Sequence, residues 1–187
     1  GTLFGGSVWT YDFAGGTLTR LTTVGSAANP EWSPDGRRVL YARGDLRGET
    51  ALWWQPADGS GSASRLFGAA GEDIFEGTLT PDGQALIYRT SGRGGVQGIF
   101  TVSLDSGRAG SGAVPRPLVT ATAPSLMPRL SPDGRWLAYE SGESGVLQIY
   151  VCAFPGPGGR TQVSIGGGTE PVWAHDGRHL FYRDGRR

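Results

Sequence analysis

Five polar side chains are the main candidates for chemistry in this sequence: Asn29, Glu31, Glu76, Arg129 and Glu170. Three are carboxylates and one is a guanidinium, so the set favours a polar or cationic ligand over a bare phosphate. Three carboxylates that converge would also suit a hard cation, which takes oxygen ligands. A channel-bound cation is therefore left open, although the sequence identifies no set of metal ligands and no cofactor.

Other candidate motifs have simpler explanations. His175 and His179 lie in the sequence HDGRH, but two ligands do not define a zinc site and the chain has no third His. Cys152 is the only Cys, so no internal disulfide can form, and its alternating surroundings predict a small buried apolar residue. There is no G-x-S-x-G nucleophile elbow and no phosphate-binding loop. We name no catalytic residue, and nothing in the sequence specifies an enzyme.

A strand–turn–strand sequence recurs along the chain and positions the polar candidates. Its first copy, Trp32-Ser33-Pro34-Asp35-Gly36, runs on into Val39-Leu40-Tyr41. Pro presets φ, Asp can bond its own backbone, and Gly takes the positive φ that lets the chain reverse. The other copies span 79–83, 130–134 and 173–177, and the turn Asp residues lie 47, 51 and 43 residues apart. This β-rich period is typical of a propeller with one four-stranded blade per repeat.

Each repeat is expected to supply four strands, lettered A to D from the strand before the turn. Strand A of a propeller lines the central channel. Aligned on the turns, two sets of residues are equivalent: Asn29, Glu76, Met127 and Glu170, and two residues later Glu31, Thr78, Arg129 and Val172. Polar residues that differ between repeats are what a binding surface needs, although a solvated channel rim without a ligand would show the same pattern. We expect a ligand to bind at the face where the A strands begin.

Large apolar residues also recur and predict the core. We expect the residues just before the turns to pack between blades against the tyrosines of strand B. The first set is Trp32, Leu79, Leu130 and Trp173, and the second is Tyr41, Tyr88, Tyr139 and Tyr182.

The predicted fold is therefore an all-β propeller of four-stranded antiparallel blades, with residues 1–187 as a single domain or propeller fragment. The repeat units are about 1–44, 45–92, 93–142 and 143–187. The chain opens with strands C and D and closes with strands A and B, so the two ends could share one blade and close a four-bladed ring. The alternative is four repeats of a six- or seven-bladed ring. Unpaired blade edges would favour self-association.

Composition limits the classes of function. Lys plus Arg and Asp plus Glu are both 17, and the net charge is zero, which argues against a general binder of nucleic acid or membrane surfaces. No apolar run is long enough to span a membrane. The chain begins without Met, which indicates a fragment or a processed piece of a longer protein.

The repeated pattern WSPDG-x-x-apolar-x-Tyr, followed by a strand such as Ile149-Tyr150-Val151, resembles the TolB-type, WD-like β-propeller repeat. The resemblance covers nearly the whole chain, although Leu79 and Leu130 replace the usual Trp and His175 the usual Pro. The last repeat is similar to the C-terminal blades of bacterial TolB-like proteins, many of which follow a Ser/Thr kinase domain and a membrane span. The resemblance implies a bacterial sensor propeller in the periplasm or another extracytoplasmic compartment.

Two classes of function follow. The first is a non-catalytic sensor or binding module that recognises a protein or a small polar ligand at the channel face. The second is enzymatic: either the accessory propeller of a longer, prolyl-oligopeptidase-like hydrolase, or a promiscuous metal-dependent hydrolase that uses the channel carboxylates.

Overall fold

The computed structural model describes residues 6–23, 25–44, 49–68, 73–90, 97–105, 113–120, 123, 125–156 and 158–184. These residues form sixteen β-strands. No helix in this part of the chain has the length and apolar character needed to cross a membrane. Sheet by sheet, the strands are β1 (Trp9–Asp12) and β2 (Thr17–Arg20); β3 (Ser26–Trp32), β4 (Arg38–Gly44), β5 (Thr50–Pro56) and β6 (Ser64–Phe67); β7 (Ile74–Leu79), β8 (Ala85–Thr90), β9 (Gly98–Ser103) and β10 (Arg116–Thr120); β11 (Ser125–Leu130), β12 (Trp136–Ser141), β13 (Gln148–Ala153) and β14 (Arg160–Gln162); and β15 (Thr169–Trp173) and β16 (Leu180–Arg183).

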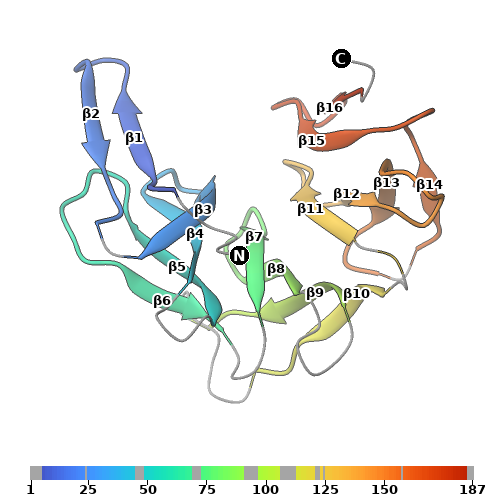
Figure 1. Ribbon diagram of the computed structural model, residues 1–187, viewed down its shortest axis with the longest axis horizontal. Coiled ribbons are helices and arrows are strands. Elements are labelled where there is room, and N and C mark those ends of the chain that lie inside the picture. The colour runs from blue at the N-terminus through green and yellow to red at the C-terminus, as the bar shows by residue number, and fades with distance from the viewer. Residues whose placement is uncertain are drawn as a thin grey trace.

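The sheets are arranged as the blades of a propeller. Three sheets have four antiparallel strands in simple chain order, which are the predicted strands A to D. Figure 1 shows the five sheets following one another around an arc, with β3, β7, β11 and β15 innermost. This arrangement confirms the all-β propeller fold and the placement of strand A at the centre. Each complete sheet combines strands from two consecutive repeat units.

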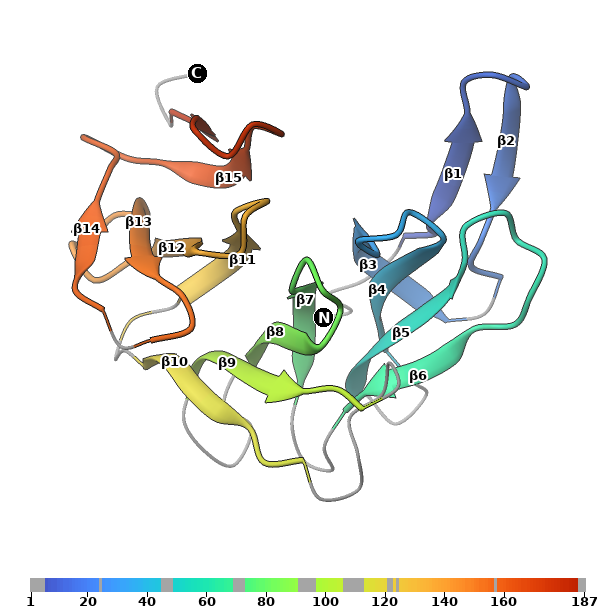
Figure 2. The ribbon, with the colours of Figure 1, turned by 180° about the vertical axis from the view of Figure 1, so that it is seen from behind.

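The arc is open, so of the two predicted alternatives the closed four-bladed ring is not formed. The half-sheets β1–β2 and β15–β16 are separate two-stranded sheets and lie at opposite ends of the arc (Figures 1 and 2). The open arc agrees with the other prediction, four repeats of a larger ring.

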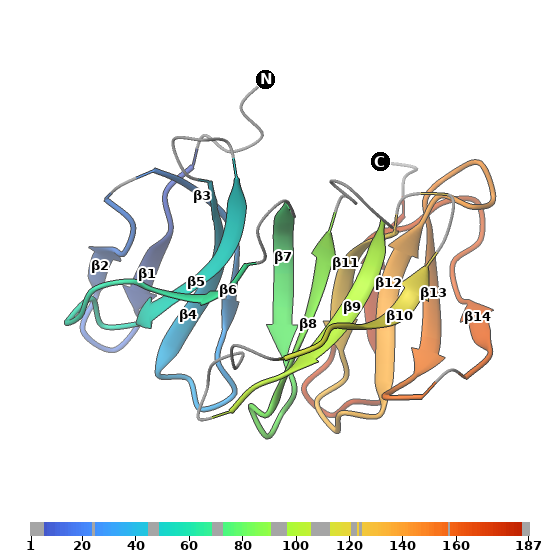
Figure 3. The same ribbon diagram turned by 90° about the horizontal axis from the view of Figure 1, so that it is seen from below.

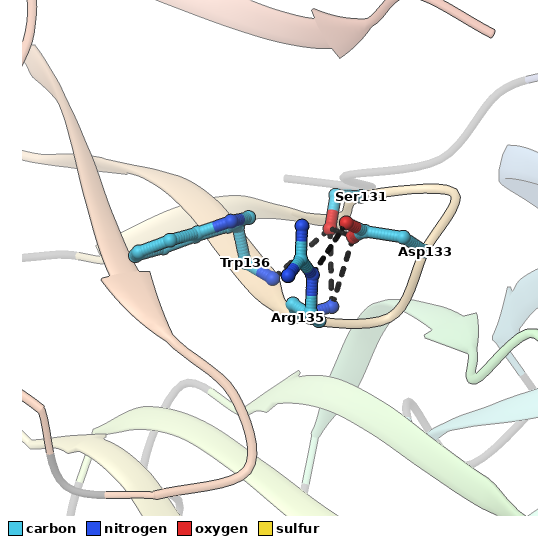
Figure 4. Close-up of polar contacts among 4 residues, drawn as sticks. All are labelled: Ser131, Asp133, Arg135 and Trp136. Carbon is cyan, nitrogen blue, oxygen red and sulfur yellow. Dashed lines mark hydrogen bonds and ion pairs between the residues drawn. The ribbon is translucent and has the colours of Figure 1, made fainter. Parts of the chain in front are cut away.

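The turn chemistry is confirmed in all four copies. The turn glycines Gly36, Gly83, Gly134 and Gly177 have φ of 67, 69, 71 and 67°. In three turns a hydroxyl donates to the turn Asp at 2.6 Å, as Ser131 Oγ does to Asp133 Oδ1. Figure 4 shows this network, in which Arg135 also pairs with Asp133, and together these bonds lower the pKa of Asp133 to about 2. The turns between strands A and B of the three complete sheets project from the same face of the propeller, at the bottom of the view in Figure 3.

The core lies in the wedges between sheets. One apolar cluster joins the first and second complete sheets, and another joins the second and third. Tyr41, Tyr88 and Tyr139 are each 1% exposed, as predicted for the strand B tyrosines. Tyr182 is instead 38% exposed, because β16 lacks the strands C and D that cover the others.

Trp32 is also outside the core, contrary to the prediction, and is 56% exposed. The equivalent Trp173 donates its indole N–H to the carbonyl oxygen of Arg129, at 3.0 Å, on strand A of the preceding sheet. The sheet before Trp32 is the half-sheet β1–β2, which has no strand A. Trp32 therefore lacks the neighbour that an interior position would provide.

Candidate functional site

The inner strands share a bulge that shapes the wall of the channel. The pairing of strand A with strand B shifts by one residue in all four copies. Asn29, Met127 and Glu170 occupy these bulges with φ of 52, 51 and 55°, the left-handed region that is uncommon for residues other than Gly. Each is followed by Pro, which has no N–H to give to the ladder. These residues lie within strands β3, β11 and β15, so the candidate site includes the channel wall as well as the loops that lead into these strands.

Hydrogen bonds at the bulges link neighbouring sheets around the axis. The Asn29 side chain on β3 donates from Nδ2 to the carbonyl oxygen of Phe75 on β7, at 2.9 Å. The Met127 backbone N–H donates to Oε1 of Glu76 at 2.8 Å. The Glu170 backbone N–H donates to Oε1 of Glu140 at 2.6 Å. A carboxylate of one sheet therefore satisfies a bulge N–H of the next, which stabilises the sheet-to-sheet contact at the axis.

Two Glu–Arg pairs occupy the same positions in different repeats. Glu76 pairs with Arg89, and Glu170 pairs with Arg183, both at 2.7 Å. The first pair is largely buried, with side chains 3% and 20% exposed for Glu and Arg, and the Arg89 guanidinium also lies over the ring of Phe75. The second is open, at 50% and 63%. Glu76 is thus held by two partners, whereas Glu170 presents much of its carboxylate to solvent.

The clearest sign of convergence is a contact between the first and third complete sheets. Arg129 Nε on β11 lies 4.0 Å from Glu31 Oε2 on β3, across the axis and past the intervening sheet. The side chains are 21% and 32% exposed, so this is a loose pair that solvent can still reach. Residues almost a hundred positions apart in the sequence therefore meet at the axis, as the repeat alignment predicts.

The predicted residues fall into two groups. The Glu170 side chain is half-exposed, and those of Glu31 and Arg129 are partly buried but still reached by solvent. Asn29 lies between the first and second complete sheets. Glu76 is 2% exposed and is engaged by Arg89 and Met127, so it acts as a structural support beneath the site.

Sequence reasoning missed Arg89, Glu140 and Arg183. They lie on strand B, each seven residues after its turn Asp, and the fourth equivalent is Ala42. The sequence does contain a signal for this position, because a charged residue occupies it in three of the four repeats. Each of the three side chains contacts a residue at a bulge.

Burial raises the pKa of two carboxyl groups near the axis, those of Glu140 and Glu31. Desolvation raises the pKa of Glu140, and repulsion from Glu76 and Glu170 adds to this, while the Glu170 N–H and Arg129 oppose it. Desolvation likewise raises the pKa of Glu31, with Arg129 opposing. A carboxyl group whose pKa is raised by folding stabilises the fold most while it is protonated.

We therefore expect Glu140→Gln to stabilise the protein increasingly as pH rises. The stabilising contribution of protonated Glu140 is complete below the unfolded pKa and is lost as pH rises through the raised folded pKa. Gln keeps Oε1 as an acceptor for the Glu170 N–H but never ionises. Near pH 8, the melting temperature of the variant should exceed that of the parent by roughly 2–4 °C, which corresponds to about 1 kcal/mol for a domain of this size. Near pH 4 the difference should be smaller. A difference that shrinks as pH rises would contradict this expectation.

The other sequence candidates have structural roles. Asp176 accepts a hydrogen bond from the Arg178 N–H at 2.9 Å, and His179 Nδ1 lies 3.2 Å from its other oxygen. Of the HDGRH motif, His179 therefore belongs to the turn network. Cys152 is buried on β13, and burial raises the pKa of its thiol. Among the described residues, no group of three or more His, Cys, Asp or Glu side chains is arranged to hold a metal ion.

These features define a class: an open-arc β-propeller whose axis carries a cluster of acidic and basic side chains. No family model matches the chain, and no curated protein matches it. Solved structures do show its fold. TolB from Acinetobacter baumannii matches with a TM-score of 0.78 and 18% identity, over 97% of this chain and 44% of that one. A protein of Agrobacterium tumefaciens described as TolB matches with a TM-score of 0.76 and 21% identity, over 95% of this chain and 62% of that one.

A puromycin-hydrolyzing peptidase from Mycobacterium tuberculosis matches with a TM-score of 0.64 and 19% identity, over 89% of this chain and 30% of that one. This chain therefore spans less than two thirds of the length of each of these proteins. The comparisons show that the chain has a TolB-like β-propeller fold.

Proposed function

We propose that the chain is a non-catalytic binding or sensor module that recognises a protein segment or a small polar ligand at the axis. Glu31, Arg129 and Glu170 would contact the ligand, with Asn29 beside them and Glu76 beneath them. The observation that carries the proposal is the loose pair between Arg129 and Glu31, at 4.0 Å and partly exposed. Such a pair contributes little to folding and can exchange partners at low cost.

The chemistry of the site indicates which ligands fit. The accessible carboxylates Glu31 and Glu170 favour an ammonium or guanidinium group, and Arg129 can bind a carboxylate in a bidentate manner. A basic peptide, or one with mixed charges, suits this arrangement better than a phosphate. The TolB-like fold supports protein binding and an extracytoplasmic location as parts of the same proposal.

An accessory role in a longer hydrolase is the second candidate. It is favoured by one observation, the shared fold with the Mycobacterium tuberculosis peptidase, of which this chain covers 30%. In that case the propeller would carry no catalytic group, and its axial charges would act on substrate access. We find no observation that favours a metal-dependent hydrolase.

The binding test uses three peptide probes of equal length, one basic, one acidic and one of mixed charge, with calorimetric titration of the full chain. The double substitution Glu31→Gln/Glu170→Gln removes two accessible charges with little change of shape. We expect it to weaken binding of the basic peptide roughly tenfold, since each exposed pair contributes up to about 1 kcal/mol. The matched control is Glu143→Gln, because Glu143 pairs with Arg160 away from the axis at 2.7 Å.

Other outcomes would redirect the proposal. Unchanged affinity in the double variant would place the ligand elsewhere. A separate titration with Ca²⁺ alone tests the channel-bound cation, and Ca²⁺ binding that the double variant loses would assign the axis to a cation.

A further inference from the structure

The wedge between the first and second complete sheets is open at the A–B turns, whereas the next two wedges are closed there. A Cβ atom at Gly134 would lie 3.3 Å from Cδ of Pro81 in the preceding turn, and one at Gly177 would lie 3.8 Å from Cδ of Pro132. A Cβ atom at Gly83 would meet no atom of the described residues within 4 Å. The open space is a pocket of about 380 Å³, lined by the first two turns and by Arg38, Trp54 and Leu79.

One wall of this pocket carries an oriented guanidinium group. Arg38 Cζ lies 4.1 Å from the centre of the Trp54 ring, and Trp54 is held in turn by its indole N–H, which donates to Ser64 Oγ at 2.9 Å. Stacking uses the face of the guanidinium and leaves its in-plane N–H groups free to bind a carboxylate in a bidentate manner. Among the described residues, no carboxylate forms an ion pair with Arg38.

The stacked pair is specific to this wedge. The strand B residue equivalent to Arg38 is Ala85 in the second complete sheet and Trp136 in the third. By the strand register, the residues equivalent to Trp54 are Thr101 and Val151. The wedge that is open at its turns is therefore also the one that has a guanidinium group on its wall.

The rim of the pocket is anionic, because each of the first two turns contributes an exposed carboxylate, Asp35 or Asp82. Each accepts a hydroxyl of its own turn at 2.6 Å and a backbone N–H, in both cases through Oδ1. These bonds, the hydroxyl first, lower the pKa of both carboxyl groups, so both are ionised at neutral pH. In the third turn Arg135 pairs with Asp133 Oδ2 (Figure 4), but within the described part of the chain no cation pairs with Asp35 or Asp82.

The pocket thus presents one cationic and two anionic groups that do not pair with one another. We propose that it binds a small zwitterion of the α-amino-acid type, with the ligand carboxylate on Arg38 and the ammonium group on Asp35 and Asp82. Each charge of the ligand then meets the opposite charge on the wall. Leu79 and the turn prolines make the rest of the wall apolar, which suits an aliphatic side chain. The volume is that of a small-molecule site.

This site is separate from the one proposed at the axis. None of the five axial candidates lines the pocket. The A–B turns lie at the bottom of the view in Figure 3, on the face opposite to the one where the A strands begin. The two proposals therefore stand or fall independently.

The test is an NMR titration of the intact chain with L-leucine and two derivatives. N-acetyl-L-leucine lacks the ammonium charge, and L-leucinamide lacks the carboxylate. With L-leucine, the amide signals of Arg38 and Gly83 should shift with a Kd of about 1 mM or tighter, while those of Gly134 and Gly177 at the closed positions should not. Each derivative loses one charge-assisted contact, so each should bind about tenfold more weakly or worse.

Substitutions then assign each charge of the ligand to its partner. Arg38→Gln should weaken L-leucine binding about tenfold and remove the preference over L-leucinamide, while the preference over N-acetyl-L-leucine remains. Asp35→Asn/Asp82→Asn should have the converse effect, and Asn keeps the Oδ1 acceptor that the turns require. Arg38→Lys should restore part of the affinity, because it keeps the charge but loses the bidentate geometry. The matched control is Arg37→Gln, a neighbour in the same turn that does not line the pocket.

Three results would overturn the proposal. One is the absence of shifts at Arg38 and Gly83 with up to about 10 mM L-leucine. Another is equal binding of all three compounds, since a zwitterion site must distinguish them. The third is loss of the shifts in the Glu31→Gln/Glu170→Gln variant, which would place the amino acid at the axis. If Arg38→Gln fails to fold, the comparison of the three compounds on the parent chain still decides the result.

Discussion

Replacing Glu76 with Ala is expected to lower the free energy of unfolding by about 3–5 kcal/mol, the usual loss when one member of a buried ion pair is removed. The Glu76 carboxylate is 3% exposed, contacts Arg89 Nε at 2.7 Å and accepts the Met127 N–H. Its removal leaves a largely buried guanidinium and a bulge N–H without their acceptor. Urea unfolding followed by tryptophan fluorescence would measure the loss.

The chain supplies a matched control for this substitution. Glu170 pairs with Arg183 at the same repeat position and the same 2.7 Å distance, but the two side chains are 50% and 63% exposed. Glu170→Ala should therefore cost less than about 1 kcal/mol. Equal losses at Glu76 and Glu170 would show that burial does not separate the two pairs.

Pairing can be tested apart from burial with a double substitution. Glu76→Ala/Arg89→Ala removes both charges, so it should destabilise the protein by less than the two single substitutions added together. The corresponding changes at Glu170 and Arg183 should be nearly additive, because water replaces each partner in turn.

The second large effect is expected for Tyr139→Ala, a loss of about 3–5 kcal/mol, as is typical when a buried aromatic side chain is truncated. Tyr139 is 1% exposed, stacks on Tyr150 and belongs to the apolar cluster between the second and third complete sheets. Truncation opens a cavity in the wedge that holds these two sheets together.

Tyr182→Ala is the control at the same repeat position, where the side chain is 38% exposed. This substitution should cost less than about 1 kcal/mol. Comparable losses at Tyr139 and Tyr182 would show that the difference in burial does not separate the two positions.

The sequence alone determined the features that depend on local or repeated residues. Pro, Asp and Gly specify each turn through the φ values that they allow, so the four turns could be predicted without knowledge of their neighbours. The spacing of the turns then shows which positions are equivalent in successive blades. This alignment predicts that Glu31 and Arg129 both lie near the axis.

Only the tertiary structure decided how these equivalent positions differ. Glu76 and Glu170 cannot be told apart by type or spacing, yet one is buried and the other exposed, because one lies between two complete sheets and the other in a terminal half-sheet. The role of Glu140 depends on a bulge N–H supplied by the next sheet. The arrangement of the sheets in an arc likewise depends on the apolar clusters that join each complete sheet to the next. These properties depend on contacts between residues that are distant in the sequence, so they cannot be predicted from the repeat pattern.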